Sequence, residues 1–233
     1  VNGYLSVIIT EMSSRQSQHE FELTGGVLCL DFANTLGDRP RSTAEHLGGY
    51  GDLLSFSRQA GSVPAESLDE LERLAEEHPR KARSTFQRAI ELRETLFGVF
   101  SRIADGNMPE ADEIQSLNEV LRQSMSHLQL RVLDETFEWS WDEDRPCLER
   151  PLWPIVRSAG ELLTSEESRS VRQCASETCS WLFIDRSRTK RRRWCDMSTC
   201  GNRAKARRHY QRQKQTRASG QTRPRGGRTN SGQ

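Results

Sequence analysis

Four cysteines in the C-terminal third of the chain form two pairs with the same internal spacing. Four residues separate Cys174 from Cys179 and Cys195 from Cys200, and fifteen residues lie between the pairs. Four thiolates at about 2.3 Å satisfy the tetrahedral preference of Zn²⁺, and each short loop can supply two of the corners. The spacing predicts one structural zinc ion held by Cys174, Cys179, Cys195 and Cys200.

This set of ligands limits the chemistry of the site. Sulfur fills all four positions, so none is open for a water molecule, and metal-assisted hydrolysis is not expected. Spacing alone does not choose the metal, and an iron–sulfur cluster or redox-active thiols are the alternatives. Cys29 and Cys147 stand alone in the sequence and are expected to be small packing residues with no role in the site.

Basic residues crowd the segments around the second cysteine pair. The stretch DRSRTKRRRW leads into Cys195, and the helix-compatible stretch GNRAKARRHYQRQK follows Cys200, with Ala204 and Ala206 expected to pack inward. Lys and Arg that neutralise phosphates release counterions and give salt-dependent binding to nucleic acid. The candidate nucleic-acid contacts are Arg186, Arg188, Lys190, Arg191, Arg192, Arg193, Asn202, Arg203, Lys205, Arg207, Arg208 and Arg212. For Asn202 we favour helix capping or a hydrogen bond beside Cys200 over recognition of adenine.

A short apolar run between the two pairs is suited to one strand against the metal site. Trp181, Phe183 and Ile184 provide most of its apolar surface. A unit of about 45 residues has little apolar area to bury, so metal binding is expected to provide most of its folding free energy.

The first part of the chain must carry the elements that support this unit. Residues 27–32 are apolar and fit either a buried strand or a helix. Ser42 with Glu45 has capping-box spacing and predicts a helix that stops by Gly61. Ser67 with Glu70 predicts a second helix that ends before Pro79.

Helical spacing is most regular between Pro79 and Ala104, where apolar residues recur over about seven turns of ~3.6 residues. Gly106 closes this helix and Pro109 opens the next. Residues 128–132 and 137–141 alternate as in a hairpin with one buried face, whose aromatic stripe is expected in the core. Residues 151–164 predict a further amphipathic helix.

These elements predict a mainly α fold with a small β hairpin (α+β), joined to a small zinc finger built from cysteine pairs, a strand and a basic helix. The expected organisation is a disordered leader at 1–19, a helical domain at 20–166, a finger at 167–215 and a disordered basic tail at 216–233. The tail has no large apolar side chain to offset its ordering entropy. Met12 is a candidate for the true start.

Charge is distributed unevenly along the chain. The net charge is +1, but residues 171–233 carry +14 and residues 1–170 carry −13. This asymmetry predicts a polyanion partner for the basic end and also permits contact between the two halves. No run reaches the roughly 20 apolar residues that cross a bilayer, and no signal peptide is recognisable, so we expect no membrane partner and a cytoplasmic location.

Two motifs resemble known families. Cys200-Gly201-Asn202-Arg203, together with the preceding cysteine pairs, resembles the CGNR zinc finger over residues 171–214, and GGVLCLDFANTLGDRP resembles the opening of the ABATE domain. The ABATE domain precedes this finger in bacterial proteins described as stress-induced transcription regulators. The resemblance implies that the four cysteines bind zinc and that the finger binds DNA.

We therefore expect a DNA-binding transcription regulator whose N-terminal domain senses a small-molecule effector or forms a homodimer. RNA binding is the nearest alternative, because the tail is rich in arginine and glycine. A regulatory interaction protein whose finger binds an acidic protein partner is the second alternative. An enzyme is not expected: Asp31, Asn34, His46 and His78 are candidate polar groups, but they form no recognisable catalytic set.

Overall fold

The computed structural model describes residues 20–37, 39, 44–142 and 146–220. The chain divides into two compact units, one that ends at Cys195 and one that begins at Asp196. The predicted leader, Met12, the capping residue Ser42 and most of the predicted tail lie outside the described residues. No described helix is long and apolar enough to cross a membrane.

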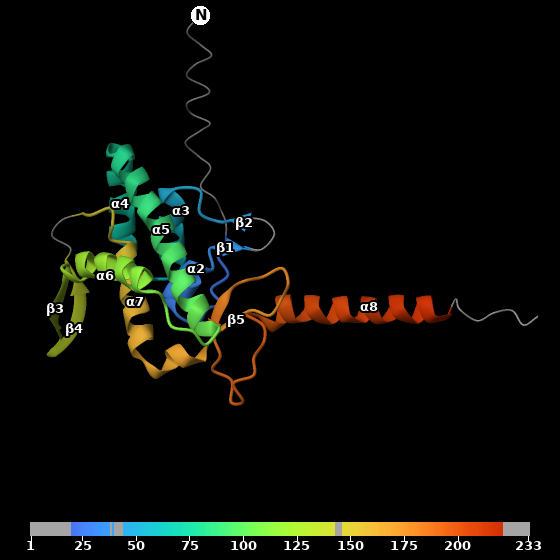
Figure 1. Ribbon diagram of the computed structural model, residues 1–233. Coiled ribbons are helices and arrows are strands. Elements are labelled where there is room, and N and C mark those ends of the chain that lie inside the picture. Colours follow the sequence, from blue (N-terminus) through green and yellow to red (C-terminus); the bar gives the residue numbers. More distant parts are fainter. Residues whose placement is uncertain (1–19, 38, 40–43, 143–145, 221–233) are drawn as a thin grey trace, which may run out of the picture. The chain divides into compact units, whose positions relative to one another are not determined.

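The first unit is mainly helical, as predicted (Figure 1). Three antiparallel strand pairs accompany the helices in the described residues, two more than the single hairpin expected from the sequence. The helices are α2 (Leu28–Ala33), α3 (Tyr50–Gln59), α4 (Ala65–Glu77), α5 (Pro79–Ala104), α6 (Ala111–Met125), α7 (Leu152–Thr164) and the 3₁₀ turn η1 (Glu166–Ser170). The strand pairs are β1 (Leu36–Gly37) with β2 (Ala44–Glu45), β3 (Leu128–Leu133) with β4 (Thr136–Trp141), and β5 (Val171–Gln173) with β6 (Leu182–Ile184).

Helix α5 has the bounds predicted for it, from Pro79 to Ala104. Proline suits the first turn because its missing N–H needs no partner there. The buried side of α5 includes Ala89, Leu96 and Phe100, and the helix packs against α2, α6 and β5. Gly106 follows with a positive φ of 80°, which supports its predicted role in ending the helix.

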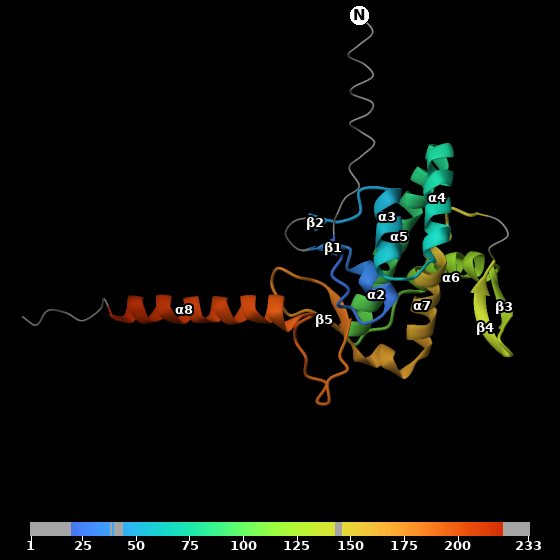
Figure 2. The same cartoon turned by 180° about the vertical axis from the view of Figure 1, so that it is seen from behind.

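The apolar run at residues 27–32, which fitted a strand or a helix, forms helix α2. It packs against α7, α5 and β6, and Figure 2 shows it beside α7. Cys29, Leu30 and Phe32 are fully buried. The same core includes Val171 and Leu182 of the finger strands, so β5 and β6 belong to the core of the helical unit.

The helix predicted to start from Ser42 and Glu45 starts later. Glu45 lies in β2, paired with Leu36, and α3 begins only at Tyr50. The Glu45 carboxylate binds the guanidinium of Arg93 at 2.6 and 2.8 Å, and that guanidinium is buried. A buried charge needs a partner of opposite sign, and this requirement, which spacing does not reveal, competes with capping.

Two other helix starts also differ from expectation. Helix α4 begins at Ala65, so Ser67 lies inside it, and Pro64 occupies the cap position with φ −56°. Proline suits a helix start because its φ is fixed, and the helix begins here without a side-chain cap. Helix α6 has a true capping box, in which Glu110 and Glu113 each accept a backbone N–H of the other, and which was not predicted.

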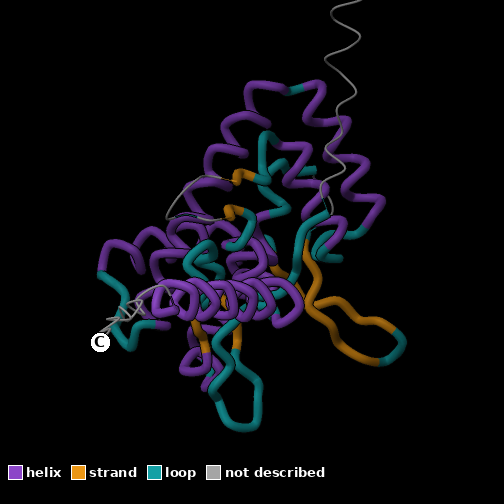
Figure 3. The backbone as a smooth tube through the Cα atoms, turned by 90° about the vertical axis from the view of Figure 1, so that its right-hand side faces the viewer, coloured by secondary structure: helices purple, strands orange, loops and turns teal. Residues whose placement is uncertain are grey.

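The predicted hairpin forms, but its apolar face is exposed. Strands β3 and β4 pair with Leu130 opposite Trp139 and Val132 opposite Phe137, and these residues are 57–75% exposed. The hairpin contacts α7 through Trp141, whose ring centroid is 5.7 Å from that of Trp153, and through Trp139, whose ring lies 5.8 Å from the guanidinium of Arg157. The expectation of a buried stripe is wrong because the hairpin projects beyond the helices that could cover it, as Figure 3 shows.

The second unit consists of a π-helical turn, η2 (Met197–Gly201), and the helix α8 (Asn202–Gly220). Helix α8 continues past residue 216, where the disordered tail was expected to begin. The prediction ended the helix where apolar residues cease, but helix propensity alone does not require them. Ala206 is exposed, so it does not pack inward as expected, and Ala204 is half-buried.

Candidate metal centre and basic surface

The first cysteine pair is held by the β5–β6 hairpin. Cys174 follows β5 directly, and its N–H donates to the carbonyl of Trp181 at 2.8 Å, which continues the strand ladder by one step. The N–H of Cys179 donates to Ser176 at 3.1 Å and closes the turn between the two sulfurs. Local backbone pairing therefore brings Cys174 and Cys179 to the same end of the hairpin.

The second pair is positioned by a cap that the sequence analysis missed. Asp196 follows Cys195, and its Oδ1 accepts the N–H of Thr199 at 2.8 Å and the hydroxyl of Ser198 at 2.5 Å. These bonds hold the pKa of Asp196 low, at about 2. The capped turn carries Cys200, and the Asp-x-x-Thr spacing at its start is the signal that could have identified the cap.

The four sulfurs of these cysteines lie within 4.8 Å of one another, and all four residues are buried. The Sγ atoms of Cys179 and Cys195 are 3.7 Å apart. Four ligands at about 2.3 Å from a tetrahedral ion stand roughly 3.8 Å apart, whereas a disulfide needs about 2.05 Å. All six cysteines of the chain are free.

Family models match this arrangement. Residues 170–213 match the CGNR zinc finger, and residues 26–166, more than half of the chain, match ABATE, described as “Putative stress-induced transcription regulator”. The chain belongs to the ABATE family. A search of curated proteins found no match. The four-cysteine cluster of the CGNR finger fits one structural zinc ion, as the sequence predicted.

The ABATE chain's sulfurs share protons unequally. Hydrogen bonds from the thiols of Cys179 and Cys195 lower the pKa of Cys174. The same hydrogen bonds raise the pKa of Cys179 and of Cys195, because each donates its proton to a neighbouring sulfur. Metal binding to such a cluster must release the retained protons, so metal affinity falls with falling pH.

The remaining cysteines take no part in the cluster. Cys29 is fully buried in α2, and burial raises its pKa to about 12. Cys147 is half-buried, and its pKa is raised to about 11, mainly by burial and also by its hydrogen bond to Glu149. Both remain protonated near neutral pH.

The basic loop that precedes Cys195 is organised by Asp185. This residue is fully buried, and its carboxylate accepts the N–H groups of Ser187 and Arg192, each at 2.9 Å. Burial alone would raise the pKa of Asp185, but these hydrogen bonds lower it. A single acidic residue therefore fixes both ends of the arginine-rich segment.

Three of the six predicted contacts in this loop are engaged within the protein. Arg186 pairs with Glu167 at 2.8 and 3.0 Å and donates to the carbonyl of Gly26. Lys190 donates to the carbonyl of Asp185, and Arg192 donates to the carbonyls of Trp194 and Cys195 while lying over the ring of Phe183. These groups brace the loop. The side chains of Arg188, Arg191 and Arg193 are exposed, and Arg193 lies 5.1 Å from the ring of Trp194.

The predicted contacts on α8 divide in a similar way. Asn202 donates to the carbonyl of Ser198 at 2.9 Å, a local hydrogen bond four residues back along the chain. Arg207 is half-buried, and the exposed cations are Arg203, Lys205, Arg208 and Arg212. Lys205, Arg208 and Arg212 share one face because residues three, four and seven apart align on a helix. Helix α8 has no acidic residue, and Tyr210 is 68% exposed on it.

The ABATE opening motif binds the finger strand directly. The amide of Asn34 accepts the N–H of Leu182 at 2.8 Å and donates to its carbonyl at 2.9 Å, so the side chain pairs with β6 as another strand would. Ile184 donates to the carbonyl of Gly25, and the indole of Trp181 donates to Leu36. Asn34 was considered as a pocket residue, and the structure places it in this buried clamp.

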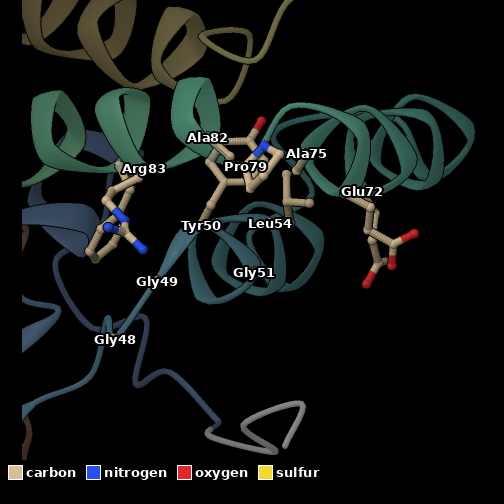
Figure 4. Close-up of a pocket in the computed structure, with 12 residues that line it drawn as sticks. Gly48, Gly49, Tyr50, Gly51, Leu54, Glu72, Ala75, Pro79, Ala82 and Arg83 are labelled. Atoms are coloured by element: carbon tan, nitrogen blue, oxygen red, sulfur yellow. The ribbon is translucent and has the colours of Figure 1, made fainter. Parts of the chain in front are cut away.

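The ABATE domain also has a cavity of about 400 Å³ between α3, α4 and α5. In Figure 4, Arg83 lies at one side and Glu72 at the other, over an apolar floor that includes Leu54 and Ala82. The histidines considered as candidate bases, His46 and His78, do not line this cavity. Its volume is within the range of small-molecule sites.

Proposed function

We propose that the protein is a transcription regulator that binds duplex DNA through its CGNR finger, with the ABATE domain as a sensor or dimerisation unit. The observation that carries the proposal is that exposed cations flank the second cysteine pair in the sequence, both in the loop before it and in the helix after it. Arg188, Arg191 and Arg193 are exposed beside the second cysteine pair, and α8 presents further cations without any acidic residue. Sulfur fills all four metal positions, so the zinc supports the finger and offers no open position for a water molecule.

The affinity would depend mainly on phosphate contacts. Each neutralised phosphate contributes a slope of about −0.9 to the dependence of log affinity on log salt for duplex DNA. Replacing one exposed cation on the shared face of α8, such as Arg208→Gln, should make this slope less steep by about 0.9. The test is fluorescence anisotropy of labelled duplex DNA with zinc-loaded protein over a range of salt concentrations.

A matched variant separates DNA contacts from general charge effects. Arg186→Gln removes the same charge, but the guanidinium of Arg186 is already paired with Glu167. We expect this variant to change the salt slope less than Arg208→Gln does. Equal slopes for both variants and the parent, or binding that ignores salt, would refute phosphate contact by α8.

RNA is the second candidate, favoured by the exposed ring of Tyr210 among the cations of α8. An exposed aromatic ring can stack on an unpaired base, which a duplex does not offer. Competition between duplex DNA and structured RNA, measured for the parent and for Tyr210→Ala, separates the two. Stronger competition by RNA that depends on Tyr210 would favour RNA.

A further inference from the structure

A second, larger cavity lies next to the finger strands. It has a volume of about 880 Å³ and is bounded by the end of α5, the loop that follows it, the first part of α6, the end of α7, η1 and β5. Ile103, Ile114 and Leu163 line its apolar part, and all three pack against the hydrophobic core. The volume is within the range of small-molecule sites, roughly 300–1,000 Å³.

The other part of the cavity is cationic. Arg172 and Arg169 both line it. Arg172 is half-buried, and the two hydrogen bonds it makes within the described part of the chain, to the carbonyls of Val171 and Arg169 at 2.7 and 2.9 Å, come from Nη1. The guanidinium is thus held in place while its Nε and Nη2 groups remain available for an anion.

The other charges in the cavity do not cancel this cation. Arg169 pairs with Glu166 at 3.1 Å, but the two side chains are 81% and 87% exposed, so the pair is weak. Asp105 is the single acidic residue among the lining residues, and it is exposed at the end of α5. The cavity therefore combines an apolar wall with one fixed, half-buried guanidinium.

We propose that this cavity is the effector site of the regulator and that it takes an amphipathic carboxylate. The apolar body of the ligand packs on Ile103, Ile114 and Leu163, and its carboxylate pairs with Arg172. The planar guanidinium matches a carboxylate and binds it through two parallel hydrogen bonds. The regulatory role of the ligand rests on the proposed function, whereas binding of the ligand is argued from the cavity and does not depend on that function.

Arg172 also gives the site a route to the finger. It is the middle residue of β5, opposite Phe183, and the metal ligand Cys174 is the first residue after the strand. A ligand that immobilises Arg172 stabilises β5 and the hydrogen bond from Cys174 to Trp181. Because coupling between two sites is reciprocal, the ligand should raise the affinity for zinc in an equilibrium competition with a chelator, and zinc should raise the affinity for the ligand by the same factor.

The test uses the zinc-loaded full chain and two probes of the same shape, 1-naphthaleneacetate and its neutral amide. Isothermal titration calorimetry should show saturable binding of the acid and at least about tenfold weaker binding of the amide, because a hydrogen bond to a charged group is worth more than a neutral one. Arg172→Gln should weaken the acid about tenfold and leave the amide unchanged. The control is Arg83→Gln, which removes an arginine from the other cavity.

Several outcomes overturn the proposal. These are the absence of saturable binding by the acid, equal affinity for acid and amide, and equal loss in the Arg83→Gln control. If Arg172→Gln does not fold, Ala104→Phe, which fills the cavity from the last residue of α5, should abolish binding of both probes. No DNA is present in these titrations, so failure of DNA binding with probe binding intact refutes only the proposed function.

Discussion

Asp31 shows how one polar residue in a core helix can set the pH dependence of stability. It lies half-buried in α2, and its Oδ1 accepts the N–H of Gly25 at 2.7 Å. Burial raises its pKa from 3.8 to about 6, although this hydrogen bond lowers it. The folded state therefore holds the proton more tightly than the unfolded chain. Its contribution to the free energy of unfolding is full below pH 3.8 and is lost as the pH rises to about 6.

Asp31→Asn should therefore raise the free energy of unfolding at pH 7.5, by up to about 3 kcal/mol. The amide keeps an oxygen for the N–H of Gly25 and removes the cost of a half-buried charge. Urea denaturation at pH 7.5 and pH 4.5 should show a gain that shrinks at the lower pH. Glu22→Gln, at an exposed position nearby, is the control. Destabilisation of Asp31→Asn at pH 7.5 would mean that the carboxylate has a favourable partner.

At the scale of elements, the contact between α2 and β6 joins the ABATE domain to the finger strands. Asn34 follows α2 and is 3% exposed, with both polar atoms of its amide bonded to the backbone of Leu182. A side chain that satisfies both groups of a buried peptide acts as a short strand. The rest of β6 is satisfied by β5 and by Gly25.

Asn34→Ala should lower the free energy of unfolding by about 2–4 kcal/mol, because it leaves a buried N–H and a buried carbonyl without partners. Asn118→Ala, at an exposed position on α6, should change it by less than about 0.5 kcal/mol. Urea denaturation gives both values, and amide hydrogen exchange at Leu182 reports the local effect. An unchanged exchange rate there would show that the clamp is not a stabilising contact.

The elements also show which parts of the fold a sequence can predict. Helix α5 follows from local information, since proline at its start, helical periodicity and Gly106 after its end agree. The start of α3 does not follow from local information, because Glu45 forms an ion pair with the buried Arg93, which is 48 positions away. The hairpin register follows from alternation, but the exposure of Phe137 depends on what lies beside the strand. Long-range partners and coverage are not encoded in local patterns.

The same division applies to the candidate site. The four metal ligands could be predicted because a structural zinc site is recognisable from its residue type and from the short loops between its ligands. The roles of the basic residues could not be predicted, because Arg186, Arg188 and Arg192 look alike in the sequence. In the structure Arg186 binds Glu167 and Arg192 binds the carbonyl of Trp194. The clamp made by Asn34 was also beyond the sequence, since its partner is 148 positions away.

At the scale of the whole molecule, the strands of the finger share the core of the helical domain, which includes Val171, Leu182 and Ile184. The expectation that metal binding provides most of the folding free energy of the finger stays a prediction, and this shared core limits it to the cysteine loops. The segments that carry the cysteines differ from these strands, because Cys174 and Cys179 flank a short loop and Cys195 and Cys200 flank a single turn. We therefore expect the core to persist without the metal and the cysteine loops to depend on it.

Removal of zinc should therefore unfold one part of the finger and leave the other part folded. Hydrogen exchange after chelation should show lost protection in residues 174–180 and 186–201, and retained protection in α5 and in β6. The helical signal in circular dichroism should fall by no more than the share of α8, which has 19 residues. Cys179→Ser should reproduce the effect without chelator, and Cys147→Ser, outside the cluster, should not. Loss of protection in α5 on chelation would instead show that the metal holds the whole fold together, and that the shared core is too weak to stand alone.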